Sequence, residues 1–137
     1  MNISVRQMQG SVPVTVLGVQ GDLDASNYQD LMAKAAEVYS AGAKDILLDW
    51  TGTPFVSSSG LVALHSIALM MSTGQPIGGS EDGWGAIQAM RRGLPTGVQQ
   101  HIKLLGPQPY VVRTLEKAGL IEFFEIHTDL DAAVASF

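Results

Sequence analysis

The sequence of 137 residues contains no cysteine and few charged side chains. The absence of cysteine excludes disulfide bonds, thiolate-bound zinc, iron–sulfur clusters and a cysteine nucleophile. Asp, Glu, Lys and Arg make up only 15% of the residues, and 13 acidic against 8 basic side chains give a net charge of −5. This excess of negative charge argues against binding of nucleic acid through its phosphates.

Long hydrophobic runs are also missing. The longest apolar stretch, residues 61–71, contains His65 and is too short to cross a bilayer. The apolar run near the N-terminus is broken by Pro13 and Thr15, and no small-residue cleavage site follows it. We therefore expect a cytoplasmic protein without a membrane segment. The hydrophobic content of 46% predicts a packed core, and the length fits a single domain over residues 1–137.

Hydrophobic periodicity predicts strands and helices in alternation after an N-terminal hairpin. Two alternating segments flank a turn at Gly10-Ser11, and Pro13 indicates that part of this hairpin lies at a sheet edge. Apolar residues at helical spacing, short apolar runs and stop signals such as Gly42 and Gly119 define the other elements. The expected strands are 3–9, 12–21, 46–48, 101–105 and 123–126, and the expected helices are 28–39, 61–71, 108–118 and 129–137.

This order predicts an α/β sandwich with a largely parallel sheet, an antiparallel hairpin at the start, and helices mainly on one face. Ser26 or Asp24 is expected to cap the first helix, and Thr128 or Asp129 the last. Residues 73–98 hold seven of the fifteen glycines and are expected to form a long Gly-rich surface excursion.

Three consecutive serines, Ser57 to Ser59, lie in the connection between the inner strand at 46–48 and the next predicted helix. Free backbone N–H groups and the positive end of the helix dipole tolerate an anion well at such a place. A serine before a helix is also a common N-cap, and the spacing does not distinguish a cap from a modified residue.

Enzymatic, metal and cofactor sites find little support. A nucleophile elbow, G-x-S-x-G, would need glycine where Val56 stands. Three histidines are candidate bases, and each lies in a predicted helix or beside a predicted strand: His65, His101 and His127. Asp22 and Asp24 have no further ligand at a recognisable spacing, and the glycines of 73–98 match no phosphate-loop pattern. We therefore expect no enzyme, no metal and no cofactor.

Three segments carry a resemblance to a known family: GDLDASNYQDL, ILLDWTGTPFVSSSGLVAL and IKLLGPQPYVVRTLEKAGLIEFFEI. Together they resemble the STAS domain, the family of bacterial anti-sigma factor antagonists. The resemblance covers residues 3–72 and 100–137, and its most specific part runs from Asp49 to Gly60.

The resemblance implies a mixed sheet of four or five strands flanked by helices. It also implies a protein that binds an anti-sigma factor, often itself a serine protein kinase. In the family, phosphorylation of one serine in an Asp-Ser-Ser-Gly motif ends this binding, and a serine phosphatase restores it. By position the acceptor here is Ser58, and Ser57 stands where antagonists usually have Asp. The implied partner-binding residues are Asp24, Asn27, Ser57, Ser58, Ser59 and Gly60.

Two other functions stay open at this point. One is a constitutive STAS scaffold or a transporter-accessory domain, in which the serines are structural. The other is a small ligand-binding or hydrolytic domain that uses residues 73–98 as a lid. The hairpin edge permits a homodimer without requiring one.

Overall fold

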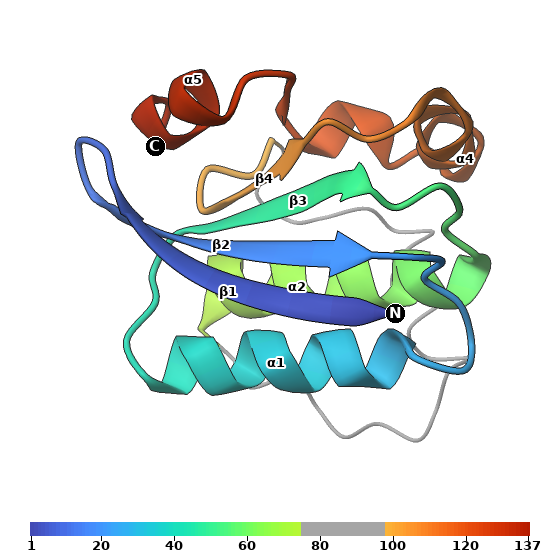
Figure 1. Cartoon of the computed structure of the whole chain (residues 1–137), viewed down its shortest axis with the longest axis horizontal. Coiled ribbons are helices and arrows are strands. Elements are labelled where there is room, and N and C mark those ends of the chain that lie inside the picture. The colour runs from blue at the N-terminus through green and yellow to red at the C-terminus, as the bar shows by residue number, and fades with distance from the viewer. Residues whose placement is uncertain (75–97) are drawn as a thin grey trace.

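The computed structural model describes residues 1–74 and 98–137. These residues form one five-stranded sheet with helices on both of its faces (Figure 1). The elements, in chain order, are β1 Asn2–Gln9, β2 Pro13–Gln20, α1 Tyr28–Ser40, β3 Ile46–Gly52, α2 Ser58–Thr73, β4 Ile102–Leu105, α4 Pro109–Ala118, the 3-10 turn η1 Ile121–Phe123, β5 Ile126–His127 and α5 Leu130–Ala135.

The five strands lie side by side in the same order as in the sequence, β1-β2-β3-β4-β5. β1 and β2 pair antiparallel, and all the other neighbouring strands pair parallel. The predicted hairpin is therefore confirmed, and β1 forms one edge of the sheet. Pro13 is the first residue of β2, where it pairs with Gln9.

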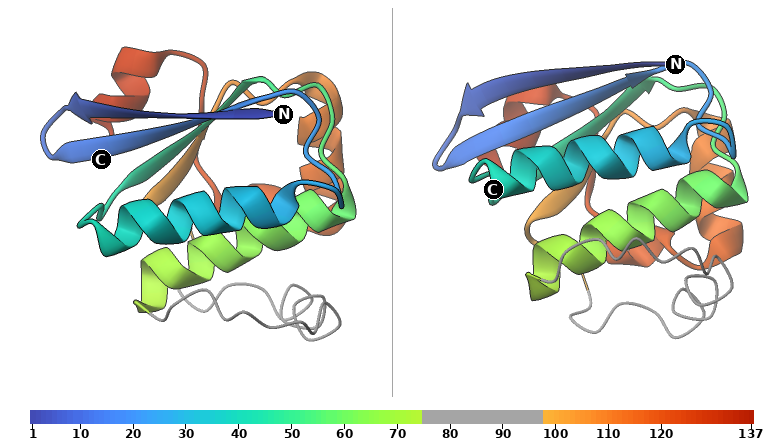
Figure 2. Two further views of the ribbon diagram at one scale, coloured as in Figure 1. Left: turned by 60° about the horizontal axis from the view of Figure 1, so that its bottom comes forward. Right: turned by 90° about the horizontal axis from the view of Figure 1, so that it is seen from below.

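The larger hydrophobic core lies between one face of the sheet and the helices α1, α2 and α4. In Figure 2, α1 and α2 run side by side below the sheet. Leu17, Leu48 and Leu104 face this core from three adjacent strands and are fully buried. From α4, Val111 and Leu115 join it at the i, i+4 spacing of one helical face.

A smaller core lies on the opposite face of the sheet. Here Val16 and Leu47, which alternate with the residues of the first core, meet Ala133 and Val134 of the short helix α5. The prediction of an α/β sandwich with helices mainly on one face is confirmed, and α5 is the helix that covers the other face.

Three local predictions were wrong in detail. Neither Ser26 nor Asp24 caps α1, because the chain makes one more turn and the cap position falls on Asn27. The helix α2 begins at Ser58, three residues before the apolar run that predicted it. The strand expected at 123–126 is reduced to β5, since Phe123 closes the 3-10 turn η1.

Other predicted ends are confirmed. Gly42 follows the last turn of α1 with a φ of 113°. Its N–H donates to the Tyr39 carbonyl and that of Ala43 to the Val38 carbonyl, the pattern of a Schellman cap. Asp129 caps α5 by accepting a 2.8 Å hydrogen bond from the N–H of Ala132. The excursion predicted for 73–98 lies, over residues 75–97, outside the described residues.

Candidate functional site

The three serines lie where the chain leaves β3 and enters α2. Ser57 is the N-cap, and its hydroxyl oxygen accepts a 3.4 Å hydrogen bond from the N–H of Gly60. Ser58 is the first residue of the helix and is exposed, whereas Ser57 and Ser59 are half-buried. Since Ser57 serves as the cap, Ser58 presents its hydroxyl at the surface.

Gly60 is the residue that lets α2 approach the preceding loop. A Cβ atom at this position would lie 2.6 Å from Cγ1 of Val56 and 3.0 Å from Cγ of Leu23. Val56 and Leu23 are themselves buried, so neither can move away without disturbing the core. The glycine of the Ser-Ser-Gly sequence is therefore explained by close packing.

The loop between β2 and α1 is tied to the segment before α2. Leu23 and Val56 form a parallel β-bridge. The N–H of Leu23 donates to the Phe55 carbonyl, and the N–H of Ser57 donates to the Leu23 carbonyl, both at 2.9 Å. The structure thus brings together the two segments that the sequence analysis selected from distant positions, 24–27 and 57–60.

Side chains of this loop hold its shape. The side-chain Oδ1 of Asn27 accepts from the backbone N–H of Asp24 at 2.9 Å, and the side-chain Nδ2 of Asn27 donates to the backbone carbonyl of Asp22 at 2.8 Å. The Asp24 carboxylate accepts from both the hydroxyl and the N–H of Ser26. The hydrogen bond from the Ser26 hydroxyl, and after it the one from the Ser26 N–H, hold the pKa of Asp24 below its ordinary value. Asp24 therefore adds a fixed negative charge to the loop at neutral pH.

A groove separates the start of α2 from α4, and we call it the α2–α4 groove. Its volume is about 800 Å³. The residues that line it are Phe55, Val56, Ser57, Ser58 and Leu61 on one side and Tyr110, Arg113, Thr114, Lys117 and Ala118 on the other. The rings of Phe55 and Tyr110 stack across it with centroids 5.8 Å apart and planes inclined by 30°.

The wall formed by α4 was missed by the sequence analysis. Tyr110, Arg113 and Lys117 recur at intervals of three and four, so they share one helical face beside the buried face of Val111 and Leu115. This spacing is visible in the sequence. It gives no sign, however, that α4 lies beside α2, because that placement follows from the pairing of β4, the strand before α4, with β3, the strand before α2.

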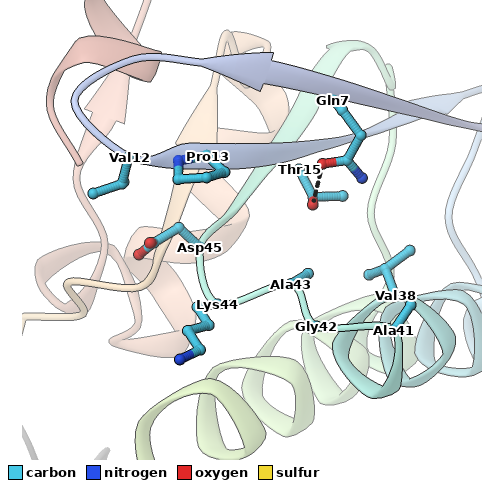
Figure 3. Close-up of a pocket in the computed structure, with 10 residues that line it drawn as sticks. All are labelled: Gln7, Val12, Pro13, Thr15, Val38, Ala41, Gly42, Ala43, Lys44 and Asp45. Atoms are coloured by element: carbon cyan, nitrogen blue, oxygen red, sulfur yellow. Dashed lines mark hydrogen bonds between the residues drawn. The ribbon is translucent and has the colours of Figure 1, made fainter.

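A second pocket, of about 560 Å³, lies at the other end of β2 and β3 (Figure 3). The hairpin and the loop between α1 and β3 line it, including Pro13, Thr15 and Lys44. The Thr15 hydroxyl donates to the Gln7 side-chain carbonyl at 3.1 Å. No residue expected to carry function lines this pocket, so it does not belong to the candidate site.

The described histidines do not form a site with Ser58. His65 is buried within α2, and none of the three histidines lines the α2–α4 groove. Nδ1 of His101 lies 2.8 Å from an Asp45 carboxylate oxygen, and Nε2 of His127 lies 3.3 Å from that of Glu125.

Within residues 1–74 and 98–137, no group of three or more His, Cys, Asp or Glu residues is placed to hold a metal ion. Within the same residues, no helix combines the length and the apolar character that crossing a bilayer requires.

Comparison with known proteins identifies the family. The STAS domain model matches residues 5–73, which is half of the chain. No curated protein matches this chain.

Solved structures with a similar fold include an anti-sigma factor antagonist from Mycobacterium paratuberculosis, with 18% identity, coverage of 98% of this chain and 93% of that one, and a TM-score of 0.62. A putative anti-sigma factor antagonist from Thermotoga maritima has 16% identity, coverage of 96% and 90%, and a TM-score of 0.70. The phosphorylated form of the Bacillus cell fate determinant SpoIIAA has 16% identity, coverage of 96% of both chains and a TM-score of 0.55. At these identities the likeness establishes a common fold. With its mixed five-stranded sheet, this chain belongs to the STAS domain family.

Proposed function

We propose that this chain is an anti-sigma factor antagonist, a non-enzymatic cytoplasmic module that binds an anti-sigma factor with serine kinase activity. Phosphorylation of Ser58 releases the partner, and a serine phosphatase restores binding. The observation that carries the proposal is the exposed position of Ser58 at the start of α2, next to a separate capping residue. The solved antagonists that share this fold support it.

The proposed partner surface consists of the loop with Asp24 and Asn27 and the start of α2 from Ser57 to Gly60. Backbone hydrogen bonds between Leu23 and its neighbours Phe55 and Ser57 hold these two segments together. A partner can therefore contact both of them at once. The surface is preformed, so binding does not require the chain to order these residues.

A phosphoryl group on Ser58 would change this surface without unfolding it. Phosphoserine carries a charge of about −1.5 to −2 at neutral pH. At the first residue of α2 the helix dipole favours that charge, so the fold tolerates it. A partner fitted to the neutral serine meets repulsion and a desolvation cost instead.

Ser57 replaces the aspartate that usual antagonists carry before the acceptor. Its hydroxyl caps α2 through the N–H of Gly60. Ser and Asp are both preferred N-caps, so the exchange keeps the local structure and removes one negative charge. We infer that the cognate kinase recognises a less acidic acceptor segment than usual.

Binding of three variants to the purified anti-sigma kinase tests the proposal. In calorimetry without ATP, Ser58→Ala should bind the kinase with the same affinity as the unaltered protein. Ser58→Asp should bind it at least ten times more weakly. Ser40→Asp is the matched control, because it adds the same charge at an exposed serine at the end of α1, outside the proposed partner surface, and it should bind normally. Equal affinity of Ser58→Ala and Ser58→Asp would contradict the phosphoswitch and favour a constitutive scaffold.

A further inference from the structure

The α2–α4 groove contrasts in charge with the rest of the protein. The chain as a whole carries a net charge of −5. Among the described residues that line the groove, however, the charged ones are both basic, Arg113 and Lys117. The other described lining residues carry no charged side chain.

Within the described part of the chain, neither groove cation has an acidic partner. The lysines that do form ion pairs with carboxylates are Lys34, with Glu37, and Lys103, with Glu125. Arg113 and Lys117 are instead exposed, and both line the same groove as Ser58. Two unpaired cations that share a groove with an exposed serine are arranged to meet an anion at that serine.

We propose that Arg113 and Lys117 receive the phosphoryl group of phosphorylated Ser58 across the α2–α4 groove. This inference rests on the proposed phosphorylation of Ser58. A guanidinium group can donate two parallel hydrogen bonds to phosphate oxygens, and the ammonium group of a lysine adds a mobile point charge. Both side chains are long and exposed, so they can turn toward the phosphate while α4 keeps its place.

The consequence is a change in the charge offered to the partner. The two cations give the described lining of the groove a formal charge of +2, and phosphoserine brings nearly −2. Phosphorylation therefore neutralises the groove and withdraws both cations from any acidic group of the partner. Release of the partner then has a second cause besides direct repulsion by the phosphate.

The test uses the full chain with phosphoserine inserted at position 58 during translation, so that it needs neither kinase nor partner. Phosphorus NMR follows the second ionisation of the phosphate, whose pKa is about 6 in an exposed phosphoserine. Each cation in contact with the phosphate, about 4 Å away, should lower this pKa by roughly 0.7 of a unit. Replacing both cations, Arg113→Gln with Lys117→Gln, should raise the phosphate pKa again by the sum of these two shifts.

The matched control is Arg6→Gln with Lys44→Gln, which removes the same charge from two residues outside the groove. This control should leave the lowered pKa unchanged. An unshifted pKa in the starting protein would overturn the inference, as would a shift that both double variants abolish equally. The proposed function would survive either result, because its own test measures affinity for the kinase.

Discussion

Gly60→Ala tests the packing that joins the two segments of the candidate site. The added Cβ would lie 2.6 Å from Cγ1 of Val56 and 3.0 to 3.1 Å from two atoms of Leu23, all in buried side chains. Overpacking of this kind costs about 2–3 kcal/mol. The higher helix propensity of alanine returns about 1 kcal/mol, so the net loss in unfolding free energy is about 1–2 kcal/mol.

Urea unfolding followed by circular dichroism measures this loss, and Ser59→Ala serves as the control one residue away. The control adds no atom and should change stability by less than about 0.5 kcal/mol. Gly60→Ala should also weaken partner binding, because relief of the contact pushes the Leu23 loop away from α2. A Gly60→Ala protein as stable as the unaltered chain would refute the close-packing explanation of this glycine.

The buried lysine of β4 carries the remaining predictions. Lys103 is 3% exposed, and its Nζ donates to the Ser136 carbonyl and hydroxyl at 2.9 and 3.1 Å and lies 3.1 Å from a Glu125 carboxylate oxygen. Lys103→Met should lower the free energy of unfolding by about 1–3 kcal/mol in urea titrations, since the Ser136 carbonyl loses its donor. The control Lys44→Met, at an exposed lysine, should change the free energy of unfolding by less than about 0.5 kcal/mol. The ion pair with Lys103 holds the pKa of Glu125 below its ordinary value of 4.5. The contribution of this ion pair to stability is therefore present above pH 4.5 and is lost as the pH falls through the pKa that Glu125 has in the folded state. Urea midpoints measured from pH 6 downward should therefore fall less steeply in Glu125→Gln, and an unchanged slope would contradict this reasoning.

The central features of the fold could be predicted from the sequence because each has a local cause. The continuous apolar run Ile46-Leu47-Leu48 is buried on both faces of the sheet, so it predicted an inner strand correctly. Gly42 and Gly119 both adopt positive φ after a helix, as their positions predicted.

The errors arose where tertiary contacts decide. β5 is only two residues long and exists because Ile126 and His127 pair with the end of β4. The cap of α1 moved to Asn27 because the Leu23 backbone is bonded to the segment before α2, which fixes where the loop ends. The sequence also predicts that Val112 of α4 points inward with Val111 and Leu115, but Val112 is only half-buried, since Val111 and Leu115 set the inward face of that helix.

The candidate site was predictable in the same uneven way. The Ser57–Gly60 segment and the Asp24–Asn27 loop were selected by their residues, and the structure places them in contact through Leu23 and Val56. Arg113 and Lys117 could not be assigned to the site from the sequence. They share a groove with Ser58 only because β4, the strand that precedes α4, lies next to β3 in the sheet.

The most direct measurement of the proposed switch is the mass of the intact protein taken from its native cells, with the modified residue mapped, across growth and stress conditions. We expect one phosphoryl group on Ser58, in a fraction of the molecules that changes with the condition. An unmodified protein under every condition, or a phosphoryl group on a residue other than Ser58, would contradict it.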